Sequence, residues 1–160
     1  MKTSIWEAML TADMNARYWK RLTQKITKQD KLIKIFLAAT SSSAVAGWGL
    51  WEIGQEVGPI LWKIASGLSA IVACALPYLN HQKNIPIASE LAGQWSELFV
   101  EYEDLWLEVK TNSNSTKTAA AFKKANKLRG RIGKKESKIP EDKKLLKECQ
   151  QEVKRSRNLK

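Results

Sequence analysis

The sequence predicts an all-α protein. We expect a two-helix transmembrane hairpin, preceded by an amphipathic N-terminal helix and followed by a long cytoplasmic helical C-terminal region, assembled into an oligomer. Three observations lead to this prediction. Residues 35–51 and 64–80 are two runs of 17 residues without a charged side chain. Hydrophobic residues on both sides of these runs recur every three or four positions, which is the period of a helix. The net charge of +11 is concentrated at the two ends of the chain.

Length and residue content limit the possible functions. A chain of 160 residues makes one compact unit, since domains usually contain about 100–200 residues. Two cysteines and a single histidine are too few for a disulfide framework or a zinc site, which takes about four clustered ligands. We therefore expect neither an enzyme nor a metal site nor a cofactor.

Residues 1–31 are predicted to form a cytoplasmic amphipathic helix. Its hydrophobic stripe has helical spacing, and its other face is basic toward the C-terminal end. One interpretation is a helix that packs on its own bundle, and the other is a helix on the anionic inner leaflet of a membrane. The stripe consists of Ile5, Met9, Ala12, Ala16, Trp19, Leu22 and Ile26.

Residues 32–79 are predicted to form the transmembrane hairpin, with spans at 32–51 and 57–79. Both spans reach the roughly 17–25 residues that cross a bilayer as helix. Small residues recur at four-residue spacing in each span, which lets two helices approach closely. The alternative is a soluble helical bundle in which these two segments are buried core helices.

The charge distribution predicts how the hairpin is oriented. Residues 1–34 hold 8 basic and 3 acidic side chains, residues 35–110 hold 3 and 8, and residues 111–160 hold 16 and 5. By the positive-inside rule, both termini are then cytoplasmic and the short acidic turn lies outside. We expect a multi-pass protein of the inner membrane, and no signal peptide is evident because residues 1–30 lack an apolar core.

Residues 84–110 are predicted to form a second cytoplasmic amphipathic helix, with Pro86 in its first turn. Its aromatic-rich stripe steps by three and four, and the remainder of the helix is acidic. Such a stripe packs either within the chain or against the same helix of another subunit. The candidates for packing in the oligomer are Trp95, Leu98, Tyr102, Leu105 and Trp106.

Residues 111–118 are polar and predict a linker, and residues 119–160 form a basic helical tail. We expect a short helix that stops near Gly130 and a last helix opened by Pro140. The tail is either solvated, specific for an anion, or folded on a protein partner. Candidates for binding an anion or nucleotide are Lys123, Lys124, Lys127, Arg129 and Arg131.

The segment ARYWKRLTQK, the Ser- and Ala-rich first span with its pattern at residues 40–47, and the short acidic turn together resemble the SLATT family. These are bacterial two-span membrane proteins found beside nucleotide-second-messenger synthases and other conflict systems. The resemblance covers roughly residues 5–110 and leaves the basic tail unmatched.

The resemblance implies an oligomeric pore- or channel-forming effector of an antiphage system. Such an effector is gated by a nucleotide signal or a nucleotidyltransferase-type partner and acts by membrane depolarisation. Two spans cannot enclose a pore, so a tetramer or larger homo-oligomer is expected. The pore-lining candidates are Thr40, Ser43 and Gly47, and the outer-mouth candidates are Glu52, Glu56 and Lys63.

Two other functions remain open from the sequence. The first is a membrane anchor that recruits a soluble enzyme or a nucleic-acid-binding partner through its cytoplasmic helices. The second is a soluble helical adaptor. Nucleic acid itself remains a possible ligand of the tail, although Phe122 is the one aromatic residue there.

Overall fold

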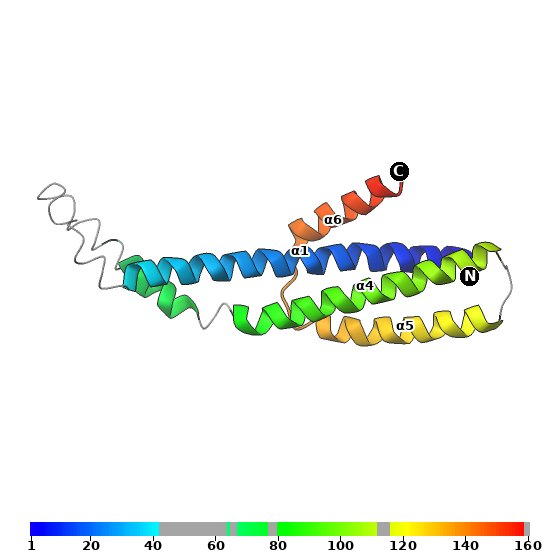
Figure 1. The fold of residues 1–160 in the computed structure, drawn as a ribbon, viewed down its shortest axis with the longest axis horizontal. Helices are drawn as coiled ribbons and strands as arrows, with labels where there is room; N and C mark the ends of the chain where they lie inside the picture. The colour runs from blue at the N-terminus through cyan, green and yellow to red at the C-terminus, as the bar shows by residue number, and fades with distance from the viewer. Residues whose placement is uncertain (42–63, 65–66, 77–79, 112–115, 159–160) are drawn as a thin grey trace, which may run out of the picture. The chain divides into compact units, whose positions relative to one another are not determined.

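The structure is a computed structural model, and it describes residues 1–41, 64, 67–76, 80–111 and 116–158. Its elements are α1 (Lys2–Ser41), α4 (His81–Thr111), α5 (Thr116–Glu136) and α6 (Lys143–Ser156), and residues 67–76 are also helical. Within these residues no strand occurs, so the predicted all-α class is confirmed. Figure 1 shows α4 and α5 side by side, running in opposite directions.

The chain divides into two compact units, so the expectation of one compact unit from the chain length is wrong. The first unit combines Met1–Gln24 with Asn84–Lys160, and it contains the N-terminal part of α1, most of α4, and all of α5 and α6. The second unit is Lys25–Lys83.

The core of the first unit is built from hydrophobic stripes at helical spacing. Ile5, Met9 and Ala12 of α1 are at most 1% exposed, as are Leu91 and Leu98 of α4. Burying an isoleucine, methionine or leucine side chain, which removes its apolar surface from water, stabilises the fold by about 1.5–3 kcal/mol. The other buried stripe residues of the first unit are Trp19, Leu22, Trp95, Tyr102, Leu105 and Val109, and Ile26 of the same α1 stripe belongs to the second unit.

Helix α5 continues past the stop expected near Gly130 and ends at Glu136. An internal glycine costs a helix about 1 kcal/mol relative to alanine. Thr118, Ala125 and Ile132 lie seven residues apart on its buried face. This tertiary packing and the Ala- and Lys-rich sequence outweigh the cost of Gly130 and Gly133.

Helix α6 begins with a side-chain cap. The carboxylate of Asp142 accepts a hydrogen bond from the Leu145 backbone N–H at 3.1 Å. The backbone N–H of Asp142 donates to the hydroxyl of Tyr18 at 2.9 Å. Cys149 and Val153 then face the core, so this short helix is fixed both at its start and along one side.

The prediction of a membrane-spanning effector is wrong for the described part of the chain. There, no helix combines the length and the apolar character that crossing a bilayer requires. Helix α1 is long enough at 40 residues, but charged residues recur along it up to Lys34. This finding contradicts the two-span hairpin, the pore and the multi-pass inner-membrane location. Most of the two expected spans, residues 42–63, 65–66 and 77–79, lies outside the described residues.

Candidate interaction surface

Helix α5 carries a row of basic side chains on the side opposite its buried face. Lys117, Lys124 and Arg131 are exposed and lie seven residues apart. Seven residues are two helical turns, or about 10.5 Å at a rise of 1.5 Å per residue. Lys127 and Lys134 repeat at the same interval beside them. We call these five residues, together with Lys123 and Lys135, the basic row.

The basic row contains most of the predicted anion-binding residues. Lys123, Lys124, Lys127 and Arg131 belong to it. Arg129 is exposed but lies on another side of α5, where its charge acts on the Tyr102 hydroxyl. Sequence reasoning missed Lys117, Lys134 and Lys135, although their helical phase relative to Lys124 was a usable signal.

The basic row is largely free of ion pairs. Among the described residues, it forms one, between Lys135 Nζ and Glu90 Oε1 at 2.6 Å. Both side chains are about half exposed, and pairs of this kind contribute roughly 0–1 kcal/mol. The positive charge of α5 is therefore available to a partner.

Helix α4 carries a complementary row of acidic side chains. Glu90, Glu97 and Asp104 are exposed and again lie seven residues apart, with Glu101 and Glu108 beside them. We call these five residues the acidic row. In the described residues, its one ion pair is the contact of Glu90 with Lys135. The sequence showed that this helix is acidic, but not that α5 lies next to it.

A partly buried carboxylate joins three helices. Oε1 of Glu136 accepts hydrogen bonds from the indole Nε1 of Trp19 and from that of Trp95, each at 2.7 Å. The two tryptophans are 4% and 2% exposed. One oxygen at the end of α5 thus satisfies buried donors of both α1 and α4.

A cavity of about 320 Å³ lies next to this carboxylate, between α1, the α5–α6 connection and α6. Tyr18, Trp19 and Ile139 of its lining are buried. The remaining lining side chains are Met14, Asn15, Glu136, Ser137, Glu141 and Leu146. None of them belongs to either charged row.

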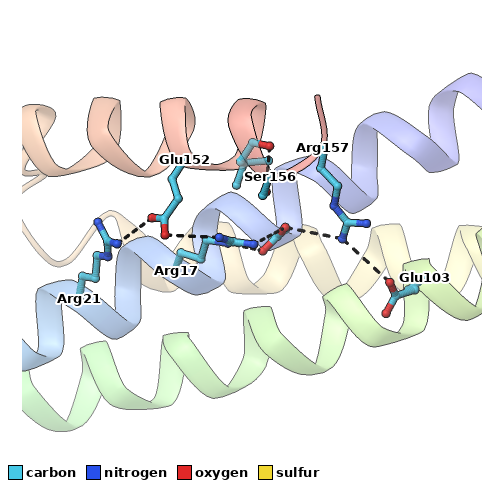
Figure 2. Close-up of polar contacts among 8 residues, drawn as sticks. Arg17, Arg21, Glu103, Glu152, Ser156 and Arg157 are labelled. Atoms are coloured by element: carbon cyan, nitrogen blue, oxygen red, sulfur yellow. Dashed lines mark hydrogen bonds and ion pairs between the residues drawn. The ribbon is translucent and has the colours of Figure 1, made fainter. Parts of the chain in front are cut away.

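A chain of ion pairs holds α6 on α1, and Figure 2 shows Arg17 and Arg157 in this chain. Arg17 Nε lies 2.7 Å from Asp13 Oδ1, and a second guanidinium nitrogen is 3.1 Å from Oδ2. This hydrogen bonding to Asp13 raises the pKa of Arg17. The outer contacts are Arg21–Glu152 at 2.7 Å, Arg17–Glu152 at 3.5 Å, Arg157–Asp13 at 3.7 Å and Arg157–Glu103 at 4.0 Å.

The residues predicted to pack in an oligomer lie inside the first unit. Trp95, Leu98 and Tyr102 are at most 2% exposed, and Leu105 is 7% exposed. Trp106 is partly buried against Trp6, with ring centroids 5.0 Å apart. Packing within the chain therefore covers this stripe, and a partner would meet a different face of α4.

Other predicted site residues lie outside the described part of the chain. Ser43, Gly47, Glu52, Glu56 and Lys63 are in this group, and for Thr40 of α1 the side chain is not described. Among the residues that are described, no three His, Cys, Asp or Glu side chains are placed to hold a metal ion.

No protein-family model matches the chain, and neither a curated protein nor a solved structure is significantly similar to it. The resemblance to the SLATT family thus stays a prediction.

Proposed function

We propose that the chain is a non-catalytic helical adaptor that binds an acidic protein partner through the basic row of α5. The observation that carries this proposal is the row itself. Its cations are exposed along one side of a helix, while the opposite side is packed into the core. A partner can therefore bind the row without disturbing the fold.

The spacing of the row favours a helical partner. Its members repeat every seven residues, and charges with this repeat lie along one stripe of a helix and meet charges of the same period on a facing helix. The row has no aromatic side chain, whereas proteins that bind single-stranded nucleic acid usually stack bases on aromatic residues. An acidic helix fits the row better than a nucleotide or a nucleic acid.

Binding of defined polyanions to the full chain tests the proposal. The probes are fluorescein-labelled polyglutamate of 30 residues and an oligouridylate of 20 nucleotides, compared by fluorescence anisotropy. We expect polyglutamate to bind, and the variant K124E/K127E/R131E to bind it about tenfold more weakly, which is the loss of three modest charge contacts.

The matched control is K143E/K144E/K147E, which lowers the net charge by the same amount at exposed positions of α6. An equal loss of affinity in this control would show that net charge alone attracts the probe, and would refute a role of the basic row. Preference for oligouridylate over polyglutamate would replace the protein partner with nucleic acid.

A further inference from the structure

We infer that the acidic partner is a second copy of this chain, bound so that the acidic row of each copy faces the basic row of the other. The inference rests on the proposed function and names its partner. The exposed charges of α4 and α5 are complementary. One molecule presents five exposed carboxylates on α4 and seven exposed or half-exposed cations on α5.

The acidic row and the basic row have the same period along their helices. Glu90, Glu97 and Asp104 repeat every seven residues, as do Lys117, Lys124 and Arg131. Helices that pack nearly antiparallel keep charges of equal period opposite one another over their whole length. The acidic row of one copy therefore faces cations of the other copy's basic row at each seven-residue repeat.

The register between α4 and α5 brings the two rows to the same height along the helices. The contacts of Glu90 with Lys135 and of Tyr102 with Asn126 fix how α4 and α5 align within one molecule. This alignment places Glu97 level with residues 128–131 and Glu101 level with residues 124–127. The acidic and basic rows of one molecule are thus at matching heights along the helices.

Symmetry then selects one arrangement. A two-fold axis parallel to α4 and α5 leaves the height of every residue unchanged and exchanges the two sides of the face. The acidic row of one copy consequently faces the basic row of the other at the same height, twice in one dimer. A two-fold axis in the face but across the helices would place acid against acid. Dimers of this self-complementary type are the commonest protein oligomers.

Two exposed apolar side chains border the acidic row. Val100 and Leu107 of α4 are 52% and 56% exposed, and they too lie seven residues apart. In the dimer they lie where the methylene stems of the facing lysines pass, and such stems cover apolar surface while their charged ends stay hydrated. The face therefore offers apolar contact as well as charge.

Within one molecule the two rows leave each other mostly unpaired. In the described residues Glu90 and Lys135 are the one pair that meets. Glu97, Glu101, Lys124 and Arg131 are exposed and have no ion pair in the described part of the chain. A second copy supplies the partners that the fold does not.

Charge exchange between two variants of the full chain tests the inference. Variant E97K/E101K/D104K reverses three charges of the acidic row, and variant K124E/K127E/R131E reverses the three cations of the basic row that lie at the same height along the helices. Sedimentation equilibrium is measured for each variant, for the wild type and for an equimolar mixture, at 50 and 300 mM NaCl. Far-ultraviolet circular dichroism reports whether each variant retains its helices.

We expect the wild type to dimerise, with a dissociation constant at least tenfold higher at 300 mM NaCl than at 50 mM NaCl, because salt screens exposed charges. Each variant alone should self-associate at least tenfold more weakly, and the mixture should regain wild-type affinity. Regain in the mixture also shows that both variants are folded. The control E7K/K143E, at exposed positions of α1 and α6, should dimerise like the wild type.

A wild type that is monomeric at both salt concentrations, or a mixture that does not associate, would overturn the inference. The adaptor proposal would still hold if polyglutamate then bound the wild type and not K124E/K127E/R131E. Conversely, dimerisation without polyglutamate binding would support the second copy and overturn the general recognition of acidic polypeptides.

Discussion

Trp19 of α1 and Trp95 of α4 are 76 positions apart in the sequence, and both donate their indole N–H groups to the same oxygen atom of Glu136 at 2.7 Å each. Both rings are buried, so neither donor has water as an alternative partner. A single carboxylate therefore determines whether two buried donors are satisfied. The stability of the first unit should depend strongly on it.

Replacing this carboxylate is the first prediction. Glu136→Ala leaves two buried indole donors without an acceptor, each costing about 1–3 kcal/mol, so we expect a loss of roughly 2–4 kcal/mol in the free energy of unfolding by urea. Glu136→Gln keeps an acceptor oxygen and should lose about 1–2 kcal/mol. A loss within 0.5 kcal/mol for both variants, equal to that of the exposed control Glu141→Ala, would contradict the double acceptor.

The ion-pair chain between α1 and α6 gives the second prediction. Asp13 is 6% exposed and accepts from Arg17 in a bidentate geometry. Asp13→Asn removes the charge while keeping the shape, and should lower stability by about 1–2 kcal/mol because Arg17 and Arg157 keep their charges without it. Glu90→Gln, in the exposed pair with Lys135, should change stability by less than about 0.5 kcal/mol. If Asp13→Asn and Glu90→Gln lowered the free energy of unfolding by urea equally, the stronger contribution of the Asp13 ion pairs would be contradicted.

The cap of α6 gives the third prediction. Asp142→Ala removes the acceptor of the Leu145 N–H, and lost caps of this kind cost about 0.5–2 kcal/mol. Asp142→Ser retains an oxygen in the same position and should stay within about 0.5 kcal/mol of the wild type. Thermal unfolding followed by circular dichroism measures both. A serine variant as unstable as the alanine variant would exclude capping as the cause.

Stability at alkaline pH gives the fourth prediction. Burial raises the pKa of Tyr18, of Tyr102 and of the Cys149 thiol above their ordinary values. The folded protein therefore holds these protons more tightly than the unfolded chain does. Their contribution to stability is complete below the pKa values of the unfolded chain, about 8.5 for cysteine and 10 for tyrosine, and it is lost as the pH rises through the folded pKa values.

We therefore expect the free energy of unfolding to fall as the pH rises from 8 to 10.5. Tyr102→Phe should lower stability by about 1 kcal/mol at pH 8, since it loses the 2.9 Å hydrogen bond to Asn126. It should also flatten the alkaline decline. A decline that is as steep in this variant as in the wild type would show that Tyr102 does not contribute to it.

Hydrophobic periodicity was enough to predict the all-α class and the stripe of α4, because a buried helix face repeats every three to four residues. It could not reveal the acceptor role of Glu136, since that contact joins residues 117 positions apart. The two uncharged runs led to a membrane prediction that the described part of the chain contradicts, since no helix there has both the length and the apolar character to cross a bilayer.

The surface could be predicted only in part. Four of the five residues chosen as anion binders lie on the basic row, because they are clustered in sequence and share a side of α5. Arg129 lies off this row because its helical phase differs from that of Lys124 and Arg131. The relation between the two charged rows depends on how α4 and α5 align, and tertiary contacts such as Tyr102–Asn126 decide that alignment.

The contacts of Glu136 have a consequence for the order of folding. Tyr102 and Asn126 are separated by 24 residues, whereas Trp19 and Glu136 are separated by 117. Closing the longer loop costs about 1.4 kcal/mol more chain entropy. The α4–α5 hairpin is therefore expected to form first, and docking of α1 onto it to complete the unit. Folding kinetics should show this as a larger φ-value for Tyr102→Phe than for Trp19→Phe.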